Sequence, residues 1–147
     1  MEVTPWTRVA LGASSLAMHA NDDVYLRTDA WHQAHGLFAR ISPWRPLVLL
    51  AEADAVLDWP SRGPPMNGAA GELQADVEPM QGLHVIVTGE AYDPGGGQKS
   101  STGGWLGVDW FFLPHCDLRG DAMLRQMGIG SSTMSVQAYM LQLHLYL

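Results

Sequence analysis

The fold is decided by residues 83–113, which read LHVIVTGEAYDPGGGQKSSTGGWLGVDWFFL. The first run, residues 83–92, is rich in β-branched side chains and has the length of a strand. The second run, residues 105–113, is aromatic and stops at Pro114, which cannot donate a hydrogen bond to a central ladder. A glycine-rich segment separates the two runs. The stretch therefore predicts a long antiparallel hairpin.

Short apolar runs and turn residues surround this hairpin. Gly12 ends the first apolar run, and Asn21, Asp22 and Asp23 favour a turn. Proline and glycine are frequent between Ser61 and Gly82, which predicts a loop. We further expect strands at residues 6–11, 24–27, 47–59 and 134–147, and a helical turn at residues 121–127.

One segment has a helical period. Trp31, Ala34, Leu37 or Phe38, and Ile41 recur at spacings of three and four residues. Thr28 or Asp29 can cap the start of such a helix. This spacing predicts one short helix over residues 30–40, which ends before the proline-containing segment 42–46.

The last apolar run, residues 134–147, changes its pattern midway. Aliphatic residues fall on even numbers up to Met140 and on odd numbers from Leu141. A strand of period two changes parity only at a bulge or where it crosses to another sheet. Fourteen extended residues span roughly 46 Å, whereas a domain of this length is about 40 Å across. We therefore expect the strand to bend or to leave the body, and its leucines to be covered.

These patterns together predict a mainly β protein. Its 147 residues form one domain, 1–147, which is long enough to fold without disulfides. The expected architecture is an antiparallel β-sandwich or barrel with one short helix and long Gly/Pro-rich loops.

Composition excludes several classes of function. The formal charge of −7 opposes nucleic-acid binding, which depends on Lys and Arg. Cys116 is the only cysteine, so an intramolecular disulfide framework is excluded. No continuous apolar run approaches the roughly 20 residues of a membrane-spanning helix, so we expect a soluble protein without a membrane partner.

Catalytic constellations are weak. Residues 95–102 resemble a phosphate-binding loop, but Gln98 precedes Lys99 where glycine is required, and a strand follows instead of a helix. His115 and Cys116 are adjacent, and neighbours on an extended chain point to opposite faces. No nucleophile and base are therefore predicted to meet.

Acidic residues offer another candidate site. Glu52, Asp54 and Asp58 share one face if residues 47–59 form a strand, and Asp109 and Glu90 are further carboxylates. Such a face can serve acid–base chemistry or lie in water, and the sequence favours the solvated face.

A metal site is a further alternative. His32 and His35 share one face of the predicted helix, a spacing that can hold zinc. The third ligand is left open among His19, nearby aspartates and the strand histidines. This arrangement would support a small metal-dependent hydrolase.

We expect, first, a non-enzymatic structural or assembly protein without cofactors, which packs into a homo-oligomer or a larger protein complex. Low charge, long loops and the apolar C-terminal run motivate this expectation, and a bacteriophage virion component, such as a capsid decoration, head–tail or tail protein, is its most specific form. The six tryptophans support a carbohydrate-binding β-sandwich as the alternative. The predicted interface residues are Trp44, Trp59, Leu141, Leu143, Leu145 and Leu147.

Overall fold

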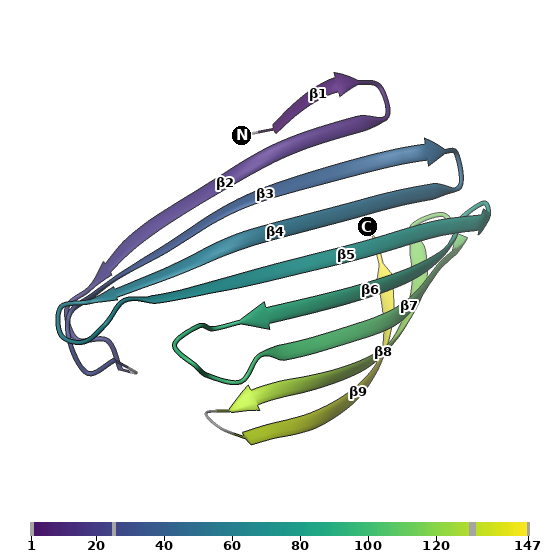
Figure 1. Ribbon diagram of the computed structural model, residues 1–147. Helices are drawn as coiled ribbons and strands as arrows, with labels where there is room; N and C mark the ends of the chain where they lie inside the picture. The colour runs from purple at the N-terminus through teal and green to yellow at the C-terminus, as the bar shows by residue number, and fades with distance from the viewer. Residues whose placement is uncertain (1, 25, 130–131, 147) are drawn as a thin grey trace.

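The chain forms one open antiparallel sheet in the computed structural model, which describes residues 2–24, 26–129 and 132–146. Each strand pairs with the next strand along the chain (Figure 1). The strands are β1 (Glu2–Trp6), β2 (Val9–Ala20), β3 (Ala30–Trp44), β4 (Leu47–Pro60), β5 (Met66–Met80), β6 (Leu83–Asp93), β7 (Ser101–Leu113), β8 (Cys116–Ile129) and β9 (Ser132–Leu145). The expected β class is confirmed.

The predicted hairpin is formed by β6 and β7. Its ladder runs from the pair Leu83↔Trp110 to the pair Tyr92↔Ser101. The connecting loop contains three successive glycines, residues 95–97, with φ of 73°, 62° and 76°. Only glycine adopts such angles without strain, which explains the Gly-Gly-Gly sequence between the two strands.

The predicted helix over residues 30–40 is wrong, and no helix occurs among the described residues. This segment lies within β3 and pairs with β2 on one side and β4 on the other. Trp31, Leu37 and Ile41 have odd numbers and point to one face, whereas Ala34 and Phe38 point to the other. The helical spacing was therefore produced by apolar residues on both faces of one strand.

Other expected loops and turns are also strand. Most of the predicted loop over residues 61–82 is β5, and the predicted helical turn over residues 121–127 lies in β8. Residues 24–27 form turns in their described part instead of a strand. Gly68 is required inside β5 because a Cβ there would lie 2.6 Å from the Asp93 carbonyl oxygen. A glycine that looked like a loop signal thus allows close approach of backbone within a sheet.

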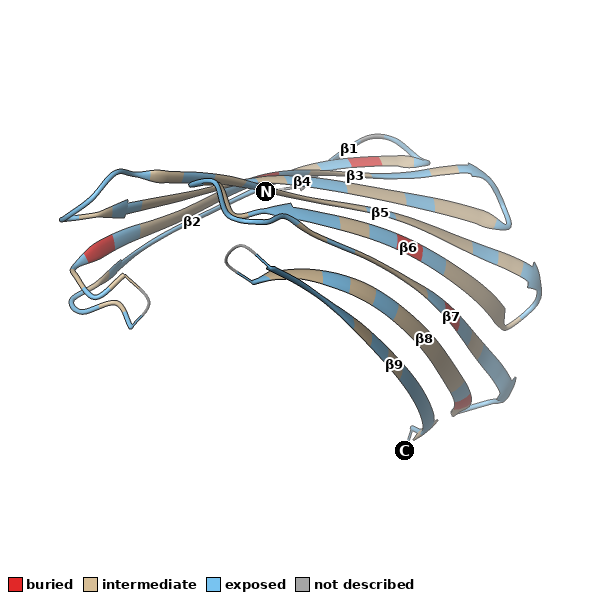
Figure 2. Cartoon of the chain, turned by 60° about the horizontal axis from the view of Figure 1, so that its bottom comes forward, coloured by how far each residue is buried: buried red, intermediate tan, exposed pale blue. Residues whose placement is uncertain are grey.

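The expected sandwich or barrel is not confirmed. The sheet is a single layer that bends into an arch, and β1 and β9 are its two edges (Figures 1 and 2). Ala10 and Ala30 are the only buried apolar residues that the described chain contains. The accessible surface is 10326 Å², against about 7400 Å² for a compact monomer of 16.0 kDa. The sheet therefore lacks a packed core of its own.

The last strand contains no bulge. The pairs of β8 with β9 keep one register from Cys116↔Leu145 to Ile129↔Ser132. The predicted bulge or crossing is wrong, because what changes along β9 is the polarity of its two faces and not the direction of its side chains. Met134 and Met140 lie on one face, and Leu141 and Leu145 on the other.

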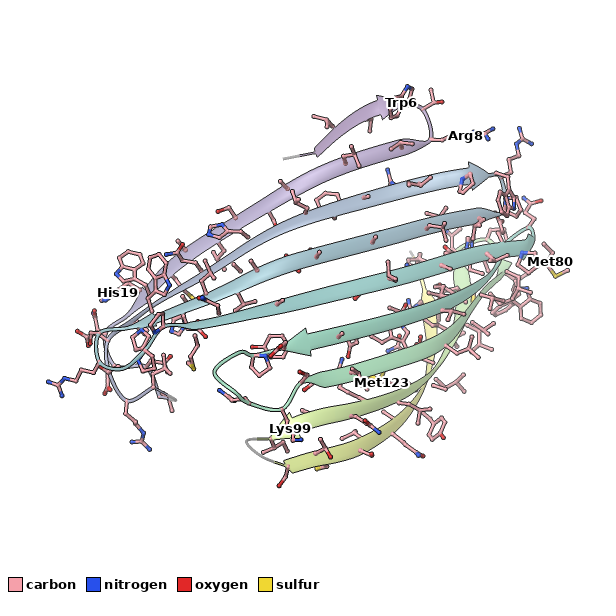
Figure 3. All side chains as sticks on the ribbon, in the orientation of Figure 1. Trp6, Arg8, His19, Met80, Lys99 and Met123 are labelled. Carbon is pink, nitrogen blue, oxygen red and sulfur yellow. The ribbon has the colours of Figure 1, made fainter. Side chains whose placement is uncertain are left out.

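The strands end at two rims. The His19 rim contains the connections β2–β3, β4–β5, β6–β7 and β8–β9, and the Met80 rim contains the other four. Figure 3 labels His19 at the first rim, and Trp6, Arg8 and Met80 at the second. These two rims are the reference for the site described below.

Candidate functional site

The register assigns the strand side chains to two faces. Directly paired residues of antiparallel strands point to the same side of a sheet, and successive residues alternate. One side, which we call the apolar face, receives the odd-numbered residues of β2–β6, the even-numbered residues of β7 up to the bulge after Trp110, the even-numbered residues of β8 and the odd-numbered residues of β9. Beyond a bulge in β3, Trp44 pairs with Leu47 and lies on the same face. We call the opposite side the charged face.

The apolar face has one charged side chain within the regular register of β2–β9 in the described chain. This residue is Asp93, at the last position of β6. Leu37, Leu73 and Leu141 are 69%, 67% and 76% exposed at mid-strand positions. Further exposed apolar residues of this face are Leu11, Trp31, Ile41, Leu49, Trp59, Val77, Val87, Leu106, Val108, Trp110, Leu118, Leu124, Tyr139, Leu143 and Leu145.

Tryptophans on the apolar face lie near the strand ends. Trp31 and Trp59 are paired at the His19 rim, and the Trp31 ring centroid is 5.1 Å from that of His19. Trp44 and Trp110 lie near the Met80 rim. Tyr139, in the middle of β9, is the aromatic exception. The middle of this face is therefore formed mainly by aliphatic and small residues.

The charged face carries a network of ion pairs and hydrogen bonds. Three of the pairs join residues on neighbouring strands or two residues apart on one strand, and the fourth joins Glu90 of β6 to Arg125 of β8 across Gly103 of β7. The pairs are Arg125 with Glu90, Arg119 Nε with Asp121 Oδ2 at 3.0 Å, His84 Nδ1 with Asp76 Oδ1 at 3.1 Å, and His144 Nδ1 with Asp117 Oδ2 at 2.9 Å. Charge is thus concentrated and paired on one side of the sheet.

A hollow of about 430 Å³ lies on the charged face. Glu52, Asp54, Glu72 and Glu90 line it together with Arg125. The prediction that Glu52, Asp54 and Asp58 share one face is confirmed, because all three lie at even positions of β4. The arrangement presents an acidic, water-accessible surface.

The charged face is the concave side of the arch. On this face, a Cβ added to Gly103 or Gly107 would meet the carboxylate of a neighbouring strand within 3 Å. On the apolar face, a Cβ at Gly89 or Gly104 would have no side-chain atom within 4 Å. Side chains converge on a concave surface and spread on a convex one, so the apolar face is convex.

A buried pair of aspartates lies at the Met80 end of the charged face. Asp117 is 1% exposed. Its Oδ2 accepts a hydrogen bond from His144 Nδ1 at 2.9 Å. Oδ1 of Asp109 and Oδ1 of Asp117 are buried and have no hydrogen-bond partner in the described chain. A proton shared by the two carboxyl groups would satisfy both atoms.

Sequence reasoning did not find this aspartate pair. The two residues flank the tight connection between β7 and β8, where Leu113 pairs with Cys116. A second hairpin predicted at Pro114 and His115 would have brought the two carboxylates onto neighbouring strands. The available signal was therefore the turn, which the aromatic run before it obscured.

His32 and His35 do not share a face. His32 lies on the charged face, with Nδ1 at 2.7 Å from Asp58 and Nε2 at 3.1 Å from Asp23. His35 lies on the apolar face, 2.9 Å from the Ser15 hydroxyl. No group of three metal-ligating side chains occurs in the described part of the chain, so the geometry does not assemble the proposed zinc site.

The predicted interface residues all point outward where they are described. Trp44, Trp59, Leu141, Leu143 and Leu145 are exposed, and their register places them on the apolar face. Leu147 lies outside the described residues. Whether another molecule covers these side chains stays a prediction.

No protein-family model, curated protein or solved structure matches this chain. Within residues 2–24, 26–129 and 132–146, we find no helix with the length and apolarity needed to cross a membrane.

Proposed function

We propose that this chain is a non-enzymatic structural protein, a wall segment that joins further β-strands at its β1 and β9 edges to form a larger sheet. The observation that carries the proposal is the accessible surface of 10326 Å² on a single-layer sheet with two buried apolar residues in its described part. A sheet on its own leaves its edge hydrogen-bonding groups open to pairing with other strands.

The direction of the edge strands limits how the sheet is extended. Because β1–β9 are nine strands paired antiparallel in sequence order, β1 and β9 run in the same direction. Antiparallel closure from β9 round to β1 therefore needs an odd number of further strands. Strands β1–β9 alone cannot close in this way, which supports the joining of further strands at the two edges.

Hydrogen exchange tests this proposal. In a free edge strand, alternate amides have no ladder partner and exchange rapidly, whereas nearly all amides of a paired strand are protected. We expect the peptide over β9 to be protected as fully as the peptide over the central strand β5. A folded protein in which about half of the β9 amides exchange at once would contradict the proposal.

The bacteriophage virion component is one specific form of this function. A protein shell would cover the sheet with other subunits, and the wall-segment proposal does not depend on that identity. The specific forms of the wall-segment function differ in the kind of molecule that covers the apolar face.

A further inference from the structure

We propose that the apolar face contacts the hydrocarbon chains of a lipid bilayer, with β2–β9 crossing the membrane and the charged face turned toward an aqueous interior. This inference rests on the proposed function, because a sheet can lie in lipid only if its edge hydrogen-bonding groups are paired. The apolar residues of one face and the ion pairs of the other both support the inference.

Charge distribution supports lipid contact. Every ion pair of the described chain that joins strand residues lies on the charged face, and Asp93 on the apolar face stands at a strand end. Strands that cross membranes alternate lipid-facing apolar residues with polar residues that face the interior. Neighbouring residues such as Glu72 and Leu73 follow this alternation.

Curvature argues against a second copy as the cover. The apolar face is convex, and two convex surfaces contact each other along a narrow strip only. Exposed apolar residues extend over the strands from Leu11 in β2 to Leu145 in β9. A fluid of hydrocarbon chains covers a convex surface of this extent completely.

The register gives a strand tilt typical of membrane-spanning sheets. The ladder line from Ala13 in β2 reaches Gln126 in β8 after six interstrand steps. Ala13 lies four residues from the start of β2, whereas Gln126 lies ten residues from the start of β8, at the same rim. The ladder line therefore shifts by about 20 Å along the strand direction while it crosses about 29 Å of sheet from β2 to β8. This ratio corresponds to a strand tilt of about 35°, within the range of about 35° to 45° in membrane-spanning sheets.

The spacing of the tryptophans matches the thickness of a bilayer. Trp31 and Trp44 lie at opposite ends of β3, separated by about 43 Å of strand. At the tilt above, this separation is about 35 Å along the membrane normal, between the hydrocarbon thickness of about 30 Å and the total of about 40 to 45 Å. Tryptophan is enriched at both interfaces of a membrane, and Trp59 and Trp110 extend the two rows.

Fluorescence quenching by brominated lipids tests the inference. Trp105 and Leu106 are neighbours on β7 that point to the charged and the apolar face. Proteins with a single tryptophan, at Trp105, at Trp110 or in the Leu106→Trp variant, with phenylalanine at the other tryptophan positions, are refolded into phosphatidylcholine vesicles. Bromine atoms are carried on the acyl chains. The native Trp110 protein keeps the test valid if the Leu106→Trp variant does not fold.

We expect the acyl-chain bromines to remove most of the emission of Trp110 and of the Leu106→Trp variant, and little of the emission of Trp105. Equal quenching at both faces would overturn the inference. A water-soluble particle in which Trp110 is shielded from acrylamide but not quenched by bromolipid would also overturn it, and the wall-segment proposal would survive. A folded monomer with acrylamide-accessible Trp110 would contradict both proposals.

Discussion

The two faces of β5 differ in polarity and in the contacts that their side chains make. Leu73 and Val77 on the apolar face are exposed side chains without a polar partner, whereas Asp76 on the charged face is hydrogen-bonded to His84. The same backbone thus separates two environments over the width of one strand. An average over the whole chain, here a mean hydropathy of −0.02, therefore does not reveal an apolar surface formed by every second residue of a strand.

The largest expected change in stability comes from placing a positive charge on the apolar face, compared with the same charge on the charged face. In vesicles, Leu73→Arg should destabilise the folded protein by about 2 to 4 kcal/mol, because position 73 is at the middle of β5 and would place a cation near the bilayer midplane. Leu16→Arg, on the charged face of β2, should change stability by less than about 0.5 kcal/mol. Denaturant unfolding in vesicles measures both. Equal effects would mean that the two faces meet the same solvent.

The second test concerns the aspartate pair on the charged face. A proton shared by the buried carboxyl groups of Asp109 and Asp117 in the folded state would give the free energy of unfolding a slope against pH. Asp109→Asn should remove that slope. Unfolding free energies between pH 4 and 7 measure it, with Asp54→Asn as the control on the same face. An unchanged slope in Asp109→Asn would refute the shared proton.

The third test compares crowding on the two faces. Gly89→Ala, on the convex apolar face, should stabilise the protein by about 0.5 to 1 kcal/mol, since glycine in a strand costs about that much relative to alanine. Gly107→Ala should destabilise it, because the added Cβ would lie 2.8 Å from the Asp121 carboxylate. Thermal unfolding of the two variants measures the sign. Stabilisation by both would show that the charged face is not concave.

The smallest expected effect concerns His32. Its Nδ1 lies 2.7 Å from Asp58 Oδ1, and this contact is an ion pair only while the imidazole is protonated. Asp58→Asn removes the carboxylate charge and should reduce the stability at acidic pH by less than about 1 kcal/mol. Denaturant unfolding at acidic pH measures the change. Equal stability of the two proteins would show that the contact contributes nothing.

Long runs with one dominant pattern were predictable. The hairpin of β6 and β7 and the strand β4 were expected because their apolar runs end at clear turn residues. Residues 30–40 were not, because Ala34 and Phe38 place apolar groups on the charged face as well. All 15 residues of β5 looked like loop for a different reason: small and acidic residues occupy a strand that packs against no second layer.

The site was less predictable than the fold. Carboxylates on one face of β4 followed from period two alone, whereas the Asp109 and Asp117 pair depends on a turn that joins two strands. The expectation of no membrane contact used a continuous apolar run as its criterion. A face formed by alternate residues contains no such run, so that criterion does not test the lipid contact proposed above.

Collision of spin labels with oxygen and with a water-soluble nickel complex along β5 tests the central claim most directly. Labels are placed one at a time at residues 70–76 in a Cys116→Ser background, in vesicles. We predict oxygen maxima at Leu73 and Ala75 and nickel maxima at Glu72 and Gln74, with a period of two residues. Nickel accessibility at Leu73 as high as at Glu72 would contradict the claim that the apolar face lies in hydrocarbon.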